Sequence, residues 1–100
     1  RLHLELAENA GERELLVYLA RAVPEYDVKA PRRVLERCHY RHADPMPLSG
    51  GVHKGNIVLL TRFPERQATA AGIPVYGSEE EQVERAVQFL SGVMDTVAKA

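Results

Sequence analysis

The chain has 100 residues, of which 45 % are apolar and 27 % are charged, and its formal net charge is −1. This composition is typical of a globular protein and excludes a disordered chain, and the length predicts a single domain, residues 1–100. A net charge near zero argues against a dedicated nucleic-acid binder. No segment approaches the roughly 18 apolar residues of a transmembrane helix.

The single cysteine, Cys38, excludes an internal disulfide bond and fits a reducing compartment, so we expect a cytoplasmic protein that makes no membrane contact. The chain begins at Arg1 rather than at a methionine, which predicts a processed or trimmed start. No motif for a bound cofactor is present in the sequence, and we expect none.

Two apolar patterns of different period follow each other at the start of the chain. Apolar and polar residues alternate over Arg1–Ala7, which predicts a half-buried strand with Leu2, Leu4 and Leu6 on one face. The segment Asn9–Glu12 has the spacing of a capping box and predicts the start of a helix. Apolar residues at helical spacing continue this helix until a proline ends it: Leu15, Leu16, Leu19, Val23 and then Pro24.

Three segments fill the middle of the chain. Tyr26–Ala30 has the residue types of a short strand. Residues 32–41 favour a helix, because Pro31 suits a first helical position and apolar residues recur at helical spacing. A strand remains the alternative there, since Arg33–His42 also alternates. Residues 43–55 contain two prolines and three glycines, which predicts a long loop of functional interest.

Residues 56–100 carry the clearest pattern of secondary structure. Ile57–Leu60 is predicted as a buried strand, Pro64–Ala71 as a short helix and Ile73–Tyr76 as a second strand. Ser78 and Glu81 form a capping box that predicts a long amphipathic helix close to the end of the chain. Strand, helix, strand and helix with short links predict a parallel βαβ unit.

The predicted fold is therefore α/β: a small single-layer sheet, with at least one parallel βαβ unit near the C-terminus, flanked by amphipathic helices. The sheet is expected to include Leu2–Leu6, Ile57–Leu60 and Ile73–Tyr76. The predicted core consists of Leu4, Leu6, Leu15, Leu16, Leu19, Val58, Leu60, Val75, Val83, Val87 and Leu90.

A wide apolar stripe runs along the predicted last helix, which also contains Phe89 and Gly92. Such a stripe is expected to pack on the sheet, and its width leaves a second interpretation, contact with a partner subunit. A protein partner, or self-association through this helix, is therefore one expectation. The stripe comprises Val83, Ala86, Val87, Leu90, Val93, Met94 and Val97.

Charge is segregated along the chain, and the middle is basic. Residues 1–28 hold three Arg against six acidic residues, residues 29–66 hold eight Lys or Arg against three, and residues 79–100 hold two against five. The basic middle is typical of solvated faces and also of an anion-binding patch, with a phosphate ligand or a nucleic acid as its partner. On a helix, Arg33, Arg37 and Arg41 would form one basic stripe, with Tyr40 available to stack on a base.

Two further segments have residues suited to binding an anion. Thr61 and Arg62 follow the strand 57–60, and ligands of parallel sheets bind beyond the carboxyl ends of strands. Lys54 lies in the glycine-containing segment 49–55, although a strand rather than a helix follows it, unlike a phosphate-binding loop. The candidate anion-binding residues are Arg33, Arg37, Arg41, Lys54, Thr61 and Arg62.

No catalytic or metal-binding arrangement can be assigned from the sequence. Cys38 and three of the histidines are the only cluster of metal-ligand types, and a structural zinc site needs four ligands. The expected function is a non-catalytic interaction or regulatory module, a subunit or part of a larger protein. The alternatives are a binder of phosphate-bearing ligands or RNA, and a small enzyme with its site at the strand ends.

Overall fold

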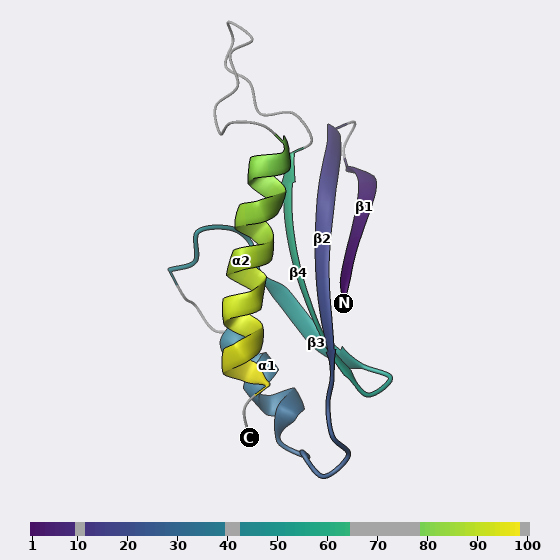
Figure 1. Cartoon of the computed structure of the whole chain (residues 1–100), viewed down its shortest axis with the longest axis vertical. Coiled ribbons are helices and arrows are strands. Elements are labelled where there is room, and N and C mark those ends of the chain that lie inside the picture. Colours follow the sequence, from purple (N-terminus) through teal and green to yellow (C-terminus); the bar gives the residue numbers. More distant parts are fainter. Residues whose placement is uncertain (10–11, 40–42, 65–78, 99–100) are drawn as a thin grey trace, which may run out of the picture.

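The computed structural model describes residues 1–9, 12–39, 43–64 and 79–98. These residues form a small α/β domain with a four-stranded antiparallel sheet and two helices (Figure 1). The strand order is β1-β2-β4-β3. The elements in chain order are β1 (Leu2–Asn9), β2 (Glu12–Ala22), α1 (Ala30–His39), β3 (Ser49–His53), β4 (Asn56–Pro64) and α2 (Glu79–Val97).

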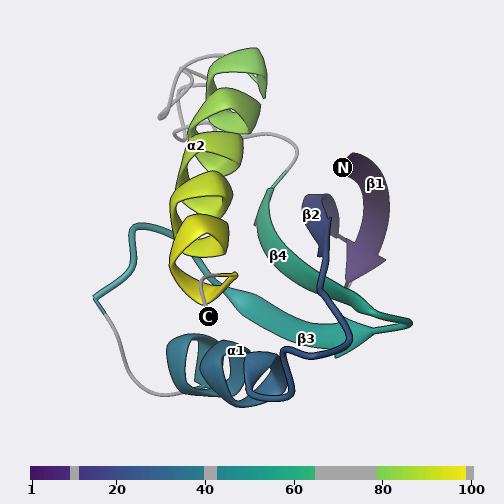
Figure 2. The same cartoon turned by 60° about the horizontal axis from the view of Figure 1, so that its bottom comes forward.

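Both helices lie on the same face of the sheet, which curves around α2 (Figure 2). Helix α2 packs on the central strands β2 and β4, and α1 packs on β3 and on α2. Side chains alternate along a strand, so every second residue of β2 and β4 points towards the helices. The resulting core cluster contains Val17, Ala30, Val34, Ile57, Leu59, Ala86, Leu90, Val93, Met94 and Val97.

The predicted helix over residues 9–23 is wrong, because this segment is the central strand β2. Leu15 and Val17 point towards the helices, whereas Leu16 and Tyr18 point to the other face. A central strand with apolar residues on both faces contains apolar residues at helical spacing as well, so periodicity alone did not distinguish the two structures. Pairing with β1 on one side and β4 on the other decides in favour of the strand.

The predicted parallel βαβ unit is not found, and every described strand pair is antiparallel. The strand predicted at Ile57–Leu60 is confirmed within the longer β4, and its neighbours β2 and β3 both run antiparallel to it. Pro64, predicted to open a helix, ends β4. The remainder of that predicted helix and the predicted strand Ile73–Tyr76 lie outside the described residues.

The predicted loop 43–55 contains a strand, β3, that forms a hairpin with β4. Lys54 and Gly55 connect the two strands, and both have positive φ, 48° and 78°. A two-residue hairpin turn of this kind needs positive φ at both central residues, which glycine adopts without strain. The glycines that suggested a loop therefore belong to a strand and its turn.

Four predicted elements are confirmed: the N-terminal strand, the helix near 32–41, the strand at 57–60 and the last helix. The short strand predicted at Tyr26–Ala30 is wrong, since these residues form turns that lead into α1. In the predicted core, Leu15 and Leu90 are buried, and Val75 lies outside the described residues. The other predicted core residues are partly or largely exposed, and Leu4 and Leu6 are the most exposed of them.

Candidate functional site

Strand β1 carries three exposed leucines on the side of the sheet that the helices occupy. Leu2, Leu4 and Leu6 are 48 %, 45 % and 49 % exposed. Their register partners on β2 are Leu19, Val17 and Leu15, which belong to the helix-facing side. We call Leu2, Leu4 and Leu6 the leucine face. It continues the core layer of the protein beyond the area that the helices cover.

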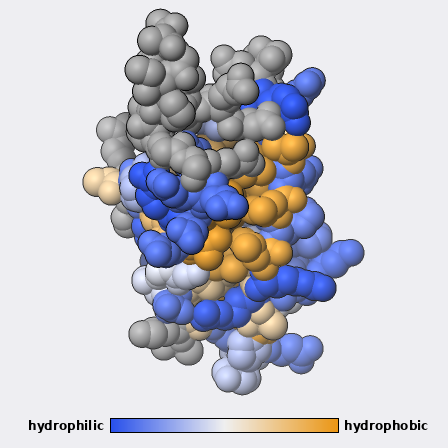
Figure 3. Space-filling model, turned by 45° about the horizontal axis from the view of Figure 1, so that its top comes forward, coloured by the Kyte–Doolittle hydropathy of each residue, from blue (hydrophilic) through white to orange (hydrophobic). Residues whose placement is uncertain are grey.

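The leucine face is exposed because neither α1 nor α2 reaches it. Strand β1 packs on β2 alone among the described elements, whereas α2 lies over β2 and β4 (Figure 1). The space-filling view shows the consequence as a band of apolar surface bordered by polar side chains (Figure 3). Single exposed leucines are ordinary on protein surfaces, whereas a contiguous row of them on a core face makes this strand a candidate interaction site.

Among the described strands, β1 is also an edge of the sheet, and its outer backbone groups have no partner in the described residues. The amino group of Arg1 donates to the carbonyl oxygen of Ala20 over 2.8 Å, and the amide of Ala20 donates back to Arg1 over 2.9 Å. In an antiparallel pair, such mutually bonded positions alternate with unbonded ones. His3 and Glu5 therefore direct their backbone groups to β2. The leucine face and Glu8 direct theirs to the open edge.

The opposite side of β1 is polar. His3 lies 3.9 Å from Glu5 between charged atoms, and its ring is 5.5 Å from that of Tyr18 on β2. Burial raises the pKa of Tyr18, and the nearby Glu5 carboxylate raises it further, so the phenol stays protonated at neutral pH. The edge strand is therefore amphipathic, with leucines on the helix side and a polar row on the other side.

The structure does not gather the described members of the predicted anion-binding set into one site. Arg33 donates two hydrogen bonds to the Asp27 carboxylate and a third, of 2.8 Å, to the carbonyl oxygen of Val97. Arg37 likewise donates two hydrogen bonds to Asp44, at 2.7 and 3.1 Å. Both guanidinium groups are thus paired with carboxylates of the same chain. These contacts tie α1 to neighbouring segments.

These ion pairs explain the shifted pKa values of their members. The hydrogen bonds from Arg33 lower the pKa of Asp27, and the Asp27 carboxylate raises the pKa of Arg33 in return. The pKa of Arg37 is raised mainly by its hydrogen bonds to Asp44. Shifts of this kind occur at functional sites and also in structural ion pairs, and the bidentate geometry here indicates a structural role.

The remaining predicted residues are spread over the molecule. Thr61 and Arg62 are neighbours on β4 and so point to opposite faces: Thr61 is 1 % exposed in the core, and Arg62 lies on the exposed face. Lys54 lies in the hairpin turn at the other end of β4, and Arg41 lies outside the described residues. The Oγ1 atom of Thr61 has no hydrogen-bond partner among the described groups.

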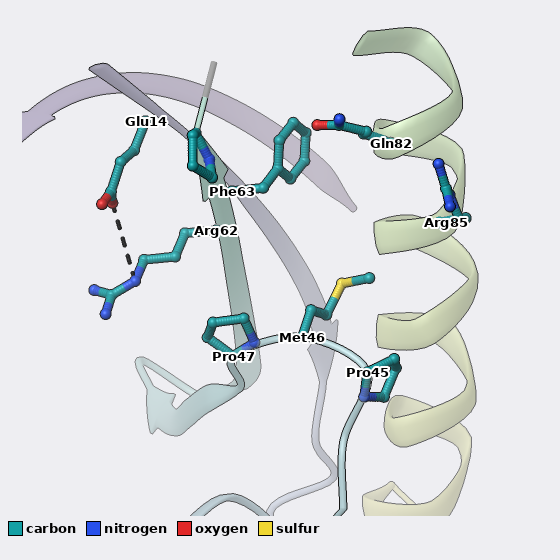
Figure 4. A pocket seen from close by; sticks show the side chains of 9 residues that line it. Glu14, Pro45, Met46, Pro47, Arg62, Phe63, Gln82 and Arg85 are labelled. Atoms are coloured by element: carbon teal, nitrogen blue, oxygen red, sulfur yellow. Dashed lines mark ion pairs between the residues drawn. The ribbon is translucent and has the colours of Figure 1, made fainter. Parts of the chain in front are cut away.

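A pocket of about 410 Å³ lies where β4 extends beyond the end of β3. Phe63 points from β4 towards α2, and Arg62 points the other way, its Nε 4.0 Å from the Glu14 carboxylate (Figure 4). Most of the lining is apolar, with charged and amide groups at its rim. The lining residues are Glu14, Pro45, Met46, Pro47, Arg62, Phe63, Pro64, Gln82 and Arg85.

The described residues contain no cluster of three or more metal-ligating side chains. Burial raises the pKa of the Cys38 thiol, which keeps this cysteine protonated and a poor nucleophile. Neither α1 nor α2 is both long and apolar enough to cross a membrane.

Comparisons of the chain with protein-family models, with curated proteins and with solved structures gave no match.

The sequence pattern identified the strand at Leu2–Leu6, but Leu4 and Leu6 were wrongly assigned to the core. Alternation shows which residues share a face and does not show whether a helix covers that face. The missing information was the strand order, which places β1 at the edge and β2 and β4 beneath α2. The apolar stripe of the last helix is used within the chain, because Ala86, Leu90 and Met94 are buried in the core.

Proposed function

We propose that this chain is a non-catalytic interaction module that binds an extended polypeptide segment along the open edge of β1. The observation that carries the proposal is the leucine face, a row of three half-exposed leucines on the core side of an edge strand whose one neighbour among the described strands is β2. Such a strand offers backbone groups for hydrogen bonds and alternate side chains for apolar contact, as in known cases of strand addition.

Strand addition at β1 would remove two unfavourable features together. The edge amides and carbonyls of the leucine face would gain partners, and the leucines would lose water contact, worth about 1 kcal/mol for each half-exposed side chain. Natural sheets usually protect an edge with lysine, proline, a bulge or a covering loop. Strand β1 has no lysine or proline and forms a regular register with β2 over its whole length.

A non-catalytic role is supported by the chemistry of the described residues. Three ionisable groups on α1 have clearly shifted pKa values: Arg33, Arg37 and Cys38. Both arginines are held in bidentate ion pairs, and the thiol is partly buried. No base with a hydrogen bond to Cys38 is found among the described contacts. A nucleophile of this kind needs an adjacent base or a lowered pKa.

Site-specific photo-cross-linking tests the proposed function. A photoreactive amino acid is placed at Leu4, and in a control chain at Leu35 on α1, which is 49 % exposed and so equally accessible. In extract of the cells that produce the protein, the Leu4 chain should form a discrete protein adduct that the Leu35 chain does not form. Equal labelling from both positions, or no adduct from either, would overturn the proposal.

A second candidate function is binding of a ligand with an apolar body and an anionic group in the pocket beside Phe63. The volume of about 410 Å³ is that of small-molecule sites, and Arg62 at its rim is more than half exposed. A thermal-shift screen with phosphate, nucleotides and short RNA at low and high salt tests this candidate. A salt-sensitive stabilisation that disappears in Arg62→Ala would support it, and no shift with any anion would end it.

A further inference from the structure

We infer that the polypeptide bound along β1 is a second copy of this chain, paired antiparallel about a two-fold axis at Leu4. This inference rests on the proposed function, because it names the partner of the same edge. It follows from the self-complementarity of β1, whose sequence offers matched side chains to its own reversed copy. A two-fold axis is also the commonest symmetry of protein oligomers.

The hydrogen-bonding pattern of β1 restricts how two copies can pair. The backbone groups that point to the open edge belong to Leu2, Leu4 and Leu6, as the bonds between Arg1 and Ala20 require. With the axis at Leu4, Leu4 lies opposite Leu4 of the second copy, and Leu2 lies opposite Leu6. Every outward-pointing backbone N–H and C=O group of the leucine face then pairs with a backbone group of a leucine in the other copy.

The polar side chains are complementary in the same register. His3 of each copy lies opposite Glu5 of the other, at a position without backbone bonds between the copies, where side chains approach each other most closely. In the single chain these two residues already lie 3.9 Å apart. The pairing therefore extends an existing contact between an imidazole and a carboxylate.

The neighbouring registers are less favourable. An axis at Glu5 would place two Glu5 carboxylates opposite each other, and like charges at such positions are destabilising. An axis at His3 would place the two His3 rings opposite each other, so His3 would no longer lie opposite Glu5 of the second copy. A slip by one residue would place leucines beside His3 and Glu5 and turn the second copy's helices to the other face.

The axis at Leu4 makes one continuous sheet from the two copies, with all helices on one face. The leucine faces meet in the middle of this sheet, side by side, and the edge at β1 disappears. Among the described strands, the remaining edges are the two β3 strands, each only five residues long. A short edge strand is one of the devices by which natural sheets avoid further pairing.

Sedimentation analysis of the purified full chain tests the inference. Over concentrations from about 1 µM to about 1 mM, the chain should shift from monomer to dimer and stop there. Leu4→Lys places two ammonium groups at the axis and should weaken association at least about tenfold. Leu35→Lys, at an equally exposed position on α1, should associate as the unaltered chain does. A monomer at all concentrations, or equal association of both variants, would overturn the inference.

Cysteine cross-linking tests the register in a Cys38→Ser background. Leu4→Cys should form a disulfide-linked dimer, because Cα atoms in a hydrogen-bonded antiparallel pair are about 5.5 Å apart, within disulfide range. Leu2→Cys should not form a disulfide-linked dimer with itself, because the register places Leu2 opposite Leu6 and keeps the two Leu2 positions apart. A mixture of Leu2→Cys and Leu6→Cys chains should form the mixed dimer. Cross-linking of Leu2→Cys with itself would contradict the register.

The two proposals fail in distinguishable ways. If the photoreactive chain forms an adduct of twice its own mass, both proposals are supported. If the adduct from Leu4 contains another protein and the purified chain stays monomeric, the second copy is excluded and the interaction module stands. If no specific adduct forms and the purified chain stays monomeric, both proposals fail.

Discussion

Thr61 is the residue that departs most from its surroundings. It occupies a core position on β4 between Leu59 and Phe63 and is 1 % exposed, yet its hydroxyl has no hydrogen-bond partner among the described groups. A buried polar group without a partner is destabilising because it has lost its bonds to water. The sequence suggested a ligand-binding role for this hydroxyl, whereas the structure points it into the apolar layer.

Thr61→Val should therefore stabilise the protein, by about 1 kcal/mol in the free energy of unfolding, because valine fills the same space without the hydroxyl. Thr61→Ser is the control: it keeps the hydroxyl, removes a buried methyl group and should destabilise by about 1 kcal/mol. Urea denaturation of the three chains measures both values. A loss of stability in Thr61→Val would show that the hydroxyl has a partner that stabilises the fold.

Asp27 gives the clearest pH dependence. Its carboxylate is 6 % exposed and accepts two hydrogen bonds from Arg33, which lower its pKa below the ordinary value of about 3.9. A lowered folded pKa means that the pair stabilises the fold fully above about pH 4, and that this stabilisation is lost as pH falls through the folded value. At neutral pH the contribution of this pair should not vary.

Asp27→Asn should lower stability at pH 7 and remove part of the loss below about pH 4. Denaturation midpoints from neutral to acid pH measure this change. The control is Asp95→Asn, whose carboxylate is 64 % exposed and pairs with Arg21 at the surface, so its effect should be small at every pH. The interpretation is wrong if Asp27→Asn and the unaltered chain lose stability in parallel on acidification.

At the scale of elements, Gly50 sets the distance between α1 and β3. A Cβ atom at this position would lie 2.8 Å from the Cys38 sulfur and 2.8 Å from a Leu59 methyl carbon, closer than such atoms can approach. Glycine here allows the helix to lie directly on the strand. In the sequence, the same glycine suggested a long loop, because nothing local shows that a helix packs against it.

Gly50→Ala should destabilise the fold by about 1–3 kcal/mol, since the added methyl group must displace α1 or the Leu59 side chain. Gly51→Ala is the matched control, because nothing lies within 4 Å of the position its Cβ would take. It should be neutral within about 0.5 kcal/mol. Thermal unfolding of both chains measures the difference, and equal stabilities would show that α1 does not pack on β3 as described.

Two of the correctly predicted elements have a local pattern with one explanation, whereas the helix near 32–41 was favoured over a strand that its pattern also allowed. The capping residues and apolar stripe of α2 indicate a helix in any context, and the alternation of Leu2–Leu6 indicates a strand. Strand β2 was predicted as a helix because its apolar residues fit both periods, and pairing with distant β4 decides between them. The predicted parallel pair is wrong for a related reason. Short links favour pairing of β4 with a strand that follows it, but its partners are β2 and β3, which both precede it in the chain.

At the scale of the whole molecule, the two helices cover only part of the sheet. Helix α2 lies over β2 and β4, helix α1 lies by β3, and neither helix covers the helix-facing side of β1. The sequence predicted the residues of the leucine face but not their exposure, since exposure depends on strand order and on where the helices end. Of the predicted basic stripe, Arg33 and Arg37 lie on α1, and Arg41 lies outside the described residues. The charges of Arg33 and Arg37 are balanced by Asp27 and Asp44, which the fold brings near them.

The central claim is that the open edge of β1 is a binding surface occupied by a second copy. Hydrogen exchange of single backbone amides, measured by NMR on concentrated protein, tests it most directly. If two copies pair, the amides of Leu2, Leu4 and Leu6 should be protected together with those of His3 and Glu5, and Leu4→Lys should restore fast exchange at the leucines alone. Fast exchange at Leu2, Leu4 and Leu6 in the unaltered chain, beside slow exchange at His3 and Glu5, would contradict the claim.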